Sequence, residues 1–170
     1  NNPTGNVIRK KVLEEVADIA VDKDLYVFSD EAYEKLIYDE KKHVSIGSLN
    51  GMEEYVATFQ TFSKSYAMCG FRIGYVAGPK ELIAAMKNSI HYVTLCPPNI
   101  SQQVAIKALQ IPEKHVQKMV TEYDRRRKFI VKRLNEIGLK TRMPGGAFYA
   151  FANTKGYAKN SIKFTQELMK

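Results

Sequence analysis

The sequence predicts an α/β fold: a mostly parallel sheet with flanking helices, followed by the start of a smaller α/β domain. Short apolar runs alternate with segments of helical apolar spacing over residues 9–110. A long amphipathic segment then precedes two short strand-like segments. Strands that alternate with helices are typical of parallel sheets joined by right-handed crossovers.

The N-terminal part of the chain predicts a turn, a helix and a strand. Residues 1–5, Asn-Asn-Pro-Thr-Gly, are turn-forming types. Residues 9–23 place apolar side chains at helical spacing, which predicts a helix. Residues 25–28 are a short apolar run that stops at Ser29-Asp30, which predicts a buried strand.

Two more strands are expected in the middle of the chain. After a polar stretch over residues 39–54, residues 55–62 are predicted to form a strand that ends at Ser63-Lys64. Residues 72–76 are predicted to form a third strand, because a Gly-Pro pair follows the apolar run.

Three helices are predicted next. Residues 80–93 and 99–110 both have helical apolar spacing, and a Pro-Pro pair separates them. Pro112 then precedes a long helix over residues 113–137, which carries a continuous apolar stripe.

The C-terminal part predicts two strands and a last helix. The strands are expected at residues 139–143 and 147–152, on either side of a Pro-Gly-Gly turn, and the helix is expected from about Asn160. The sequence therefore predicts three parts: residues 1–111 within a large domain, residues 112–137 as an interdomain helix, and residues 138–170 as the start of a small C-terminal domain.

Composition excludes several classes of protein. Of 170 residues, 45% are hydrophobic and 26% charged, which is typical of a globular chain. Two cysteines exclude a disulfide-dense scaffold and a four-cysteine zinc site, and the three histidines lack metal-ligand spacing, so no metal is expected. No apolar run approaches the ~18 residues of a membrane span, and no signal peptide is visible. We therefore expect a cytoplasmic protein and, because the chain starts at Asn1 rather than methionine, a fragment.

Polar side chains follow two of the predicted strands. Asp30 and Tyr33 come after the first strand, and Thr61, Ser63 and Lys64 come at the end of the second. Ligands bind at the carboxyl ends of strands in an open parallel sheet. We therefore expect a carboxylate, a phenol, two hydroxyls and a lysine to surround one crevice.

These residue types suit pyridoxal phosphate as a cofactor. A lysine amine forms a Schiff base with an aldehyde, which makes Lys64 the candidate attachment point. A buried Asp30 would keep the pyridine nitrogen protonated and so make the ring an electron sink. Tyr33 and Asn2 are suitable hydrogen-bond donors to the ring oxygen.

The phosphate of such a cofactor needs a cation and hydroxyl donors. Arg72 supplies a planar guanidinium fork, and Thr61 and Ser63 supply hydroxyls. Taken singly, each residue has a commoner explanation: Asp30 as a helix cap, for example, or Lys64 as a solvated charge. The prediction depends on the order and context of the whole set.

Four stretches of the sequence resemble the class I/II aminotransferases, which are pyridoxal-phosphate enzymes of the aspartate aminotransferase fold type, fold type I. They are Asn2-Pro3-Thr4-Gly5, Asp30-Glu31-Ala32-Tyr33, the segment TFSKSYAMCGFRIG from Thr61 to Gly74, and Pro144-Gly145-Gly146-Ala147-Phe148-Tyr149. The motifs occur in the order of the family and span the whole chain. The resemblance implies that residues 1–111 are the second half of the cofactor-binding large domain.

The resemblance also implies individual roles. Lys64 is similar to the Schiff-base lysine, which acts as general base on the α-proton of the substrate, and Asp30 is similar to the aspartate at the pyridine nitrogen. Tyr33 and Asn2 match the residues that hydrogen-bond the ring oxygen. Arg72 and Thr61 match residues that bind the phosphate. The family usually has Ser or Gly where Thr61 stands, so the hydroxyl is retained.

The implied enzyme is a homodimer that moves an amino group between an amino acid and a 2-oxo acid, of the aspartate, alanine or aromatic type. The phosphate loop of the family, its ring-stacking aromatic residue and its carboxylate-binding arginine are not in this sequence. We therefore expect the isolated chain to bind cofactor poorly and not to turn over. Carbon–sulfur lyases of the same fold type use the same lysine, aspartate and arginine, and this alternative stays open.

A basic helix raises a third alternative, nucleic-acid binding. The net charge is +8, and residues 113–136 contain eight Lys and Arg residues. A solvated helix face, with long basic side chains lying over apolar surface, is the favoured explanation. Because zinc-finger spacing and aromatic-rich single-strand motifs are absent as well, we expect neither a nucleic-acid partner nor a membrane partner.

Overall fold

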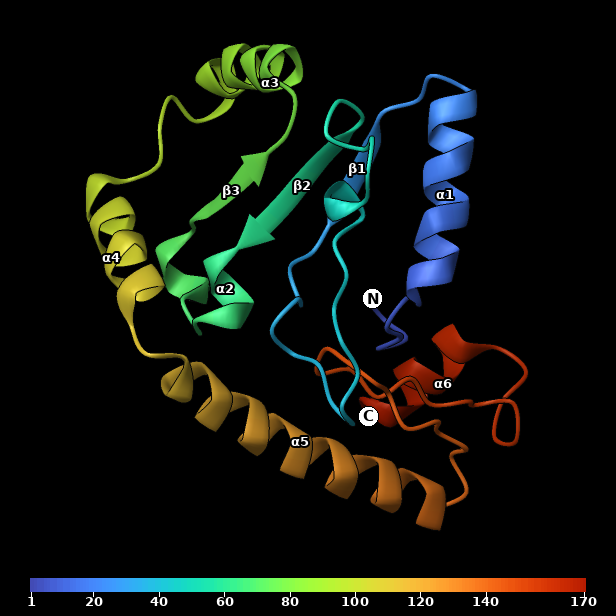
Figure 1. The fold of residues 1–170 in the computed structure, drawn as a ribbon. Helices are drawn as coiled ribbons and strands as arrows, with labels where there is room; N and C mark the ends of the chain where they lie inside the picture. Colours follow the sequence, from blue (N-terminus) through green and yellow to red (C-terminus); the bar gives the residue numbers. More distant parts are fainter. The chain divides into compact units, whose positions relative to one another are not determined.

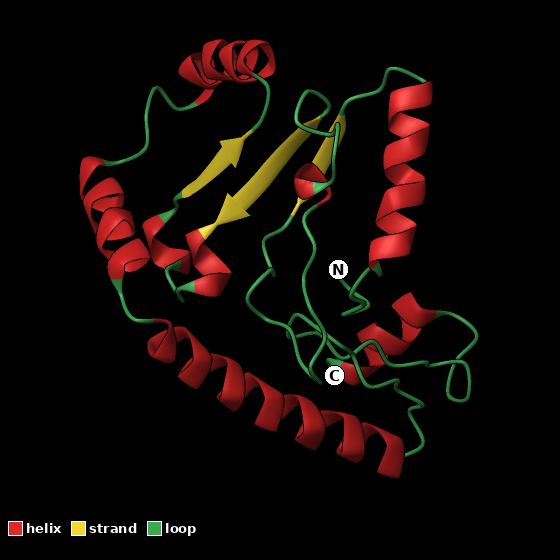
Figure 2. Ribbon diagram, in the orientation of Figure 1, coloured by secondary structure: helices red, strands yellow, loops and turns green.

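The computed structural model describes residues 1–170 without a gap (Figure 1). Its helices and strands are α1 (Lys10–Asp22), β1 (Val27–Asp30), β2 (Val56–Thr61), α2 (Phe62–Ser65), β3 (Gly74–Ala77), α3 (Lys80–Val93), α4 (Asn99–Gln110), α5 (Glu113–Glu136) and α6 (Ser161–Leu168). Two short 3₁₀ helices complete the list: η1 (Ile46–Ser48) and η2 (Cys69–Phe71). Figure 2 shows that a long loop connects α5 to α6, and that a second loop, which contains η1, connects β1 to β2.

Backbone contacts divide the chain into two compact units, which are described separately. The larger unit contains residues 8–35 and 42–117, and the smaller unit contains residues 1–7, 36–41 and 118–170. The three-part domain division expected from the sequence concerns the whole protein and stays a prediction. No helix in the structure combines the length and the hydropathy that crossing a membrane requires.

The sheet of the larger unit has the order β1-β2-β3. β1 pairs with β2 in parallel, with Asp30 opposite Phe59, whereas β2 pairs with β3 in antiparallel, with Thr61 opposite Gly74. The sheet is therefore not parallel throughout, because residues 62–73 form α2 and η2 and return the chain at the same edge. β3 also begins two residues later than expected, since Arg72 adopts a left-handed conformation (φ 51°) that interrupts an extended run.

Two apolar clusters hold the helices of the larger unit in place. In the first, Ala17 and Ala20 of α1 pack with Val56 of β2 and with Met52 and Ile46 from the β1–β2 connection. The second cluster joins α2 and the segment after it to α4, and its buried members are Phe62, Met68, Ala105 and Ala108. α1 therefore packs against the start of β2, and α4 packs against the segment that follows the end of β2.

The first strand differs from the prediction of a buried strand at residues 25–28. It forms at Val27–Asp30, and its burial alternates along the chain, so that Phe28 is 59% exposed. The alternation shows that one face of the strand is more exposed than the other, and Phe28 lies on the more exposed face. Phe28 still contacts Phe59 of β2, with ring centroids 5.8 Å apart.

The long helices confirm the periodicity read from the sequence. α3 and α4 have the predicted bounds, α1 is one residue shorter than predicted at each end, and α5 is one residue shorter at its C-terminal end. α6 begins at Ser161, because the side chain of Asn160 accepts hydrogen bonds from the N–H groups of Ile162 and Lys163, at 2.9 and 3.2 Å.

The expected strand pair in the smaller unit does not form. Residues 139–152 contribute only isolated bridges, between Thr141 and Ala152 and between Gly146 and Ile37. The Pro-Gly-Gly segment instead bonds to distant residues: the Tyr38 N–H donates to Gly145 O at 3.0 Å, and the Gly146 N–H donates to Gly5 O at 2.8 Å. Gly5 has φ +65°, and a Cβ there would lie 2.7 Å from Gly146 O, so a side chain would separate the two segments.

Candidate functional site

The candidate site lies at the carboxyl edge of the two parallel strands. Side chains alternate along a strand, and the register places Phe28 and Asp30 of β1 on the same face as Phe59 and Thr61 of β2. With Ala32 and Gln60, these residues line a hollow of about 330 Å³. That volume lies at the lower end of the range for small-molecule sites, about 300–1,000 Å³.

Asp30 ends β1 and begins a turn. Its Oδ1 accepts a hydrogen bond from the Ala32 N–H at 3.1 Å, and the Glu34 N–H donates to Glu31 O at 3.0 Å. Tyr33, which is half-buried, lies inside this turn. The aspartate and the tyrosine are therefore presented by one short, hydrogen-bonded segment that leaves the sheet edge.

Thr61 is the N-cap of the short helix α2. Its hydroxyl accepts a hydrogen bond from the Ser63 N–H at 3.1 Å and donates one to Ile73 O at 3.4 Å. Lys64 lies half-buried in this four-residue helix. The cap starts the helix directly at the strand end, which keeps Lys64 at the same edge of the sheet as Thr61.

The other two predicted site residues lie elsewhere. Arg72 is exposed after η2, and its guanidinium donates to Cys69 O at 2.9 Å. Asn2 is exposed and belongs to the smaller unit. The structure thus brings Asp30 and Thr61 to one hollow and keeps Lys64 in the same unit. The cofactor roles of all six predicted residues stay predictions.

A buried carboxylate beside Asp30 was missed by the sequence analysis. The Glu31 side chain is 4% exposed and accepts three hydrogen bonds: from Ser29 at 2.9 Å, from Ser45 at 2.7 Å, and at 2.7 Å from His43 Nε2. Burial raises the pKa of Glu31, but the hydrogen bonds from His43, Ser45 and Ser29 outweigh it, and the net pKa lies below its usual value.

Part of this network could have been read from the sequence. Ser29 and Glu31 are two residues apart along a strand direction, so they share the face opposite Asp30. His43 and Ser45 come from a polar loop, and no periodic pattern links them to the strand. In the structure, Glu31, Glu34 and His43 each place one potential ligand atom within 4.8 Å of the other two. The spacing of the histidines in the sequence did not predict this cluster.

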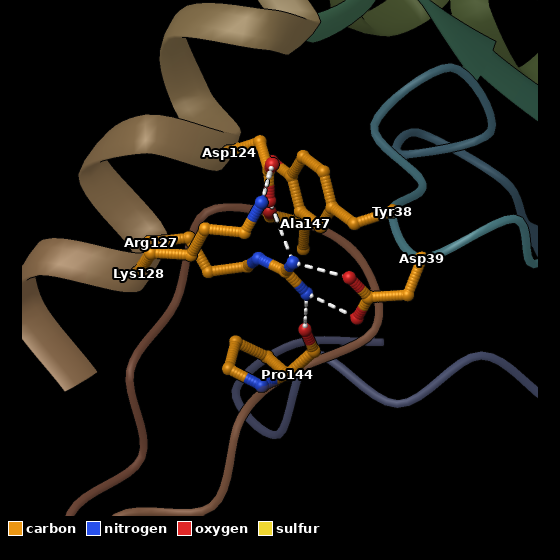
Figure 3. Close-up of polar contacts among 7 residues, drawn as sticks. All are labelled: Tyr38, Asp39, Asp124, Arg127, Lys128, Pro144 and Ala147. Atoms are coloured by element: carbon orange, nitrogen blue, oxygen red, sulfur yellow. Dashed lines mark hydrogen bonds and ion pairs between the residues drawn. The ribbon is translucent and has the colours of Figure 1, made fainter. Parts of the chain in front are cut away.

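The smaller unit contains a second unpredicted cluster, centred on Arg127 of α5 (Figure 3). The guanidinium donates to both carboxylate oxygens of Asp39, at 2.6 and 2.7 Å, and to Pro144 O at 2.5 Å. It also forms an ion pair with Asp124 at 2.6 Å and lies 4.4 Å from the centre of the Tyr38 ring. One buried arginine thus joins the helix, residues 38–39 and the Pro-Gly-Gly segment.

The electrostatics of this cluster follow from its contacts. The hydrogen bond from Arg127 lowers the pKa of Asp39, and the same bond raises the pKa of Arg127. Burial raises the pKa of Tyr38 to about 12, although the neighbouring guanidinium opposes this. The Tyr38 hydroxyl therefore stays protonated and donates to Ala147 O at 2.7 Å.

The basic residues of α5 are largely paired within the helix itself. Arg125 and Arg126 both bind Glu122, and Lys128 binds Asp124. The two arginines hold the pKa of Glu122 at about 2. These i, i+3 and i, i+4 pairs are typical of a solvated helix face, which supports that explanation over nucleic-acid binding for the paired residues.

Comparison with known proteins gives consistent results. The family model described as aminotransferase class I and II matches residues 1–170. The chain is 49% identical over 170 residues to an aspartate aminotransferase of Pyrococcus abyssi, covering 99% of this chain and 44% of that protein. It is 45% identical over 172 residues to aromatic-amino-acid aminotransferase 2 of Thermococcus litoralis, covering 100% of this chain and again 44% of the relative.

Solved structures agree with the sequence comparisons. The crystal structure of an aromatic aminotransferase from Pyrococcus horikoshii OT3 matches with a TM-score of 0.94 and 48% identity, over 99% of this chain and 46% of that one. The match confirms the α/β fold of the aspartate aminotransferase type predicted from the sequence. The chain thus spans less than half the length of these relatives.

Proposed function

Because the chain belongs to the class I and II aminotransferase family, we propose that the full-length protein moves an amino group between an amino acid and a 2-oxo acid with pyridoxal phosphate as cofactor. One observation carries the proposal. The parallel pairing of β1 with β2 places Asp30 and Thr61 at one hollow, and α2, which contains Lys64, starts directly from that edge.

The donor set at this edge fits pyridoxal phosphate. The hollow offers a carboxylate, from Asp30, for a protonated ring nitrogen. Thr61 lines the same hollow, and its hydroxyl would donate to a phosphate oxygen in place of its 3.4 Å bond to Ile73 O. Phe28 and Phe59 supply apolar walls. Arg72 and Tyr33, in the same unit, are suited to the phosphate and to the ring oxygen respectively. The role of Asn2 at the ring oxygen is proposed from the family resemblance alone.

When bound, the cofactor supplies an electron-accepting ring that stabilises negative charge at the α-carbon of the substrate. The residues of this chain would do the rest. The Lys64 amine would hold the cofactor covalently and, once displaced by substrate, carry the α-proton as general base. The Asp30 carboxylate would keep the proton on the ring nitrogen through a charge-assisted hydrogen bond.

The relatives leave the substrate open between acidic and aromatic amino acids, since their names include aspartate and aromatic-amino-acid aminotransferases. We propose an amino acid of the aspartate, alanine or aromatic type as amino donor. The test is a half-reaction: the purified full-length holoenzyme is mixed with each amino acid in turn, without an oxo acid, and the released 2-oxo acid is measured. Stoichiometric release, followed by recovery of the starting spectrum on adding a second oxo acid, is expected.

The carbon–sulfur lyase alternative gives a different result in the same experiment. A lyase would release sulfide or a thiol from a sulfur-containing amino acid and would need no second oxo acid to turn over again. Release of a thiol without a dependence on oxo acid would therefore contradict aminotransfer.

We also propose a cytoplasmic homodimer. Large apolar side chains are exposed at the end of α3, in the segment after it and at the start of α4, where Tyr92 is 93% exposed, Leu95 is 75% exposed and Ile100 is 70% exposed. Such a surface is normally covered by protein, and a second copy is one source of that cover. Light scattering of the full-length protein is expected to give twice the mass of one chain; a single-chain mass would contradict the homodimer.

A further inference from the structure

The hydrogen-bond network around Glu31 uses a buried charge that the proposed chemistry does not need. Glu31 touches no part of the hollow that Asp30 lines, since successive side chains of a strand point to opposite faces of the sheet. Its carboxylate is almost fully buried, which is costly unless every lone pair finds a donor. The role of this buried charge follows from what the hydrogen bonds of Glu31 hold in place.

The network fixes the residues on both sides of Asp30. Ser29, the residue before it, donates to Glu31 Oε1 at 2.9 Å, so the two neighbours of Asp30 are bonded to each other on the face opposite the hollow. The Glu31 N–H also continues the ladder with β2, donating to Phe59 O at 3.0 Å. The Asp30 peptide is therefore held from both ends, with its side chain directed to the other face.

The network also anchors the strand end to a distant loop. Ser45 donates to Glu31 Oε1 at 2.7 Å, and His43 Nε2 lies 2.7 Å from Oε2. Both residues come from the β1–β2 connection and belong to the same unit as the strand. The Glu31 carbonyl closes the turn that contains Tyr33, by accepting from the Glu34 N–H at 3.0 Å. One residue thus sets the strand end, the loop and the turn.

We propose that Glu31, held by Ser29, His43 and Ser45, is a positioning residue that aims Asp30 and Tyr33 at the cofactor. Only the claim that Asp30 and Tyr33 face the cofactor rests on the proposed function. The claim that Glu31 positions Asp30 can be measured without a cofactor. Glu31 itself contacts neither cofactor nor substrate. Its contribution is geometric. If a carboxylate oxygen of Glu31 no longer accepts these hydrogen bonds, the backbone at Asp30 gains freedom to move.

The first test uses amide hydrogen exchange in the full-length apoprotein. The Ala32 N–H donates to Asp30 Oδ1 at 3.1 Å, so its exchange reports the orientation of the aspartate. Glu31→Gln is expected to speed exchange of the Ala32 amide at least tenfold. Glu34→Gln is the matched control, because it removes a second carboxylate, which lies within 4.8 Å of Glu31 and His43, without removing any of the three hydrogen bonds to Glu31. Less than a twofold change is expected.

The second test uses the loaded enzyme and its spectrum. The absorbance of the bound cofactor changes with pH, and the midpoint of this change depends on the hydrogen bond between Asp30 and the ring nitrogen. Glu31→Gln is expected to move this midpoint by at least half a pH unit and to lower kcat at least tenfold with less than a threefold change in KM. Met52→Ala, which removes a fully buried core side chain behind β2, tests general destabilisation. It is expected to lower the melting temperature and leave the midpoint unchanged.

The outcomes separate the two claims. Unchanged Ala32 exchange in Glu31→Gln would overturn the positioning role, whether or not the protein binds pyridoxal phosphate. A shifted midpoint in Met52→Ala equal to that in Glu31→Gln would also overturn it, since stability alone would then explain the effect. A wild-type protein that binds no pyridoxal phosphate would instead refute the proposed function, and the exchange result would still decide the role of Glu31.

Discussion

Replacing Arg127 with methionine should loosen the smaller unit more than any change at the exposed arginines of the same helix. The Arg127 side chain is only 3% exposed, and it serves two carboxylates and a carbonyl. Removing one partner of a buried ion pair costs about 3–5 kcal/mol. The Asp39 side chain, however, is 47% exposed, so water replaces part of what it loses, and the low end, about 3 kcal/mol, is expected.

Hydrogen exchange of the full-length protein measures this effect where it acts. The Tyr38 N–H donates to Gly145 O at 3.0 Å and the Ala147 N–H donates to Leu36 O at 2.8 Å, so peptides from these two segments report their separation. A loss of about 3 kcal/mol corresponds to an acceleration of roughly a hundredfold, at about 1.4 kcal/mol per factor of ten.

Two further variants sharpen the interpretation. Arg127→Lys keeps the charge but loses the planar fork, and an acceleration of about tenfold is expected, since hydrogen bonds to charged groups contribute about 1.5–3 kcal/mol. Arg125→Met breaks only an exposed pair with Glu122 and should change these peptides less than about threefold, because such pairs contribute about 0–1 kcal/mol. If Arg127→Met behaved like Arg125→Met, the guanidinium would not be the link between these segments.

Asp30, Tyr38 and Glu31 give further predictions. Asp30→Asn should reduce kcat far more than cofactor affinity, because a ground-state contact of about 1.5–3 kcal/mol gains weight as charge develops on the ring; comparable losses in both constants would argue against this. Tyr38→Phe should lower the unfolding free energy by about 1 kcal/mol at pH 8 through loss of the bond to Ala147 O. Because the folded pKa of Tyr38 is raised from 10 to about 12, wild type should lose stability as pH rises between these values, and a phenylalanine variant with an equally steep decline would contradict that. The pKa of Glu31 is lowered from 4.5, so its stabilisation is present above pH 4.5 and is lost as pH falls through the folded value. The stability difference between wild type and Glu31→Gln, followed by urea unfolding from pH 6 to pH 3, should therefore shrink, and a constant difference would be inconsistent with a charged Glu31.

Long periodic segments were predicted well because burial of one face imposes a 3.6-residue repeat. α3 and α4 agree with prediction to the residue, and Asn160 acts as the cap expected near the last helix. Short elements carry too few residues for a repeat. The four-residue helix α2 was missed for this reason, although its N-cap, Thr61, was recognised for its hydroxyl.

Pairing between distant segments was the main source of error. The Pro-Gly-Gly segment bonds to Gly5 and Tyr38 rather than completing a strand pair with residues 139–143. Sequence pattern shows which residues can extend but not which partner they find. β3 runs antiparallel for a related reason, since its direction depends on how residues 62–73 fold at the sheet edge.

The candidate site shows the same division. The convergence of Asp30 and Thr61 was predicted because parallel strands present their carboxyl ends together, and the register confirms it. The network that supports Asp30 was not predicted, because His43 and Ser45 reach Glu31 through the fold of a loop. Residues that contact a ligand carry recognisable chemistry, whereas residues that position them are common types in ordinary surroundings.

The identity of the lysine that binds the cofactor is the most direct test of the proposed function. The full-length protein is loaded with pyridoxal phosphate and reduced with borohydride, and the modified peptide is mapped by mass spectrometry. The label is expected on Lys64, with Lys64→Ala losing it. A label on any other lysine of the wild-type protein, or equal labelling of Lys64→Ala, would contradict the assignment of the site.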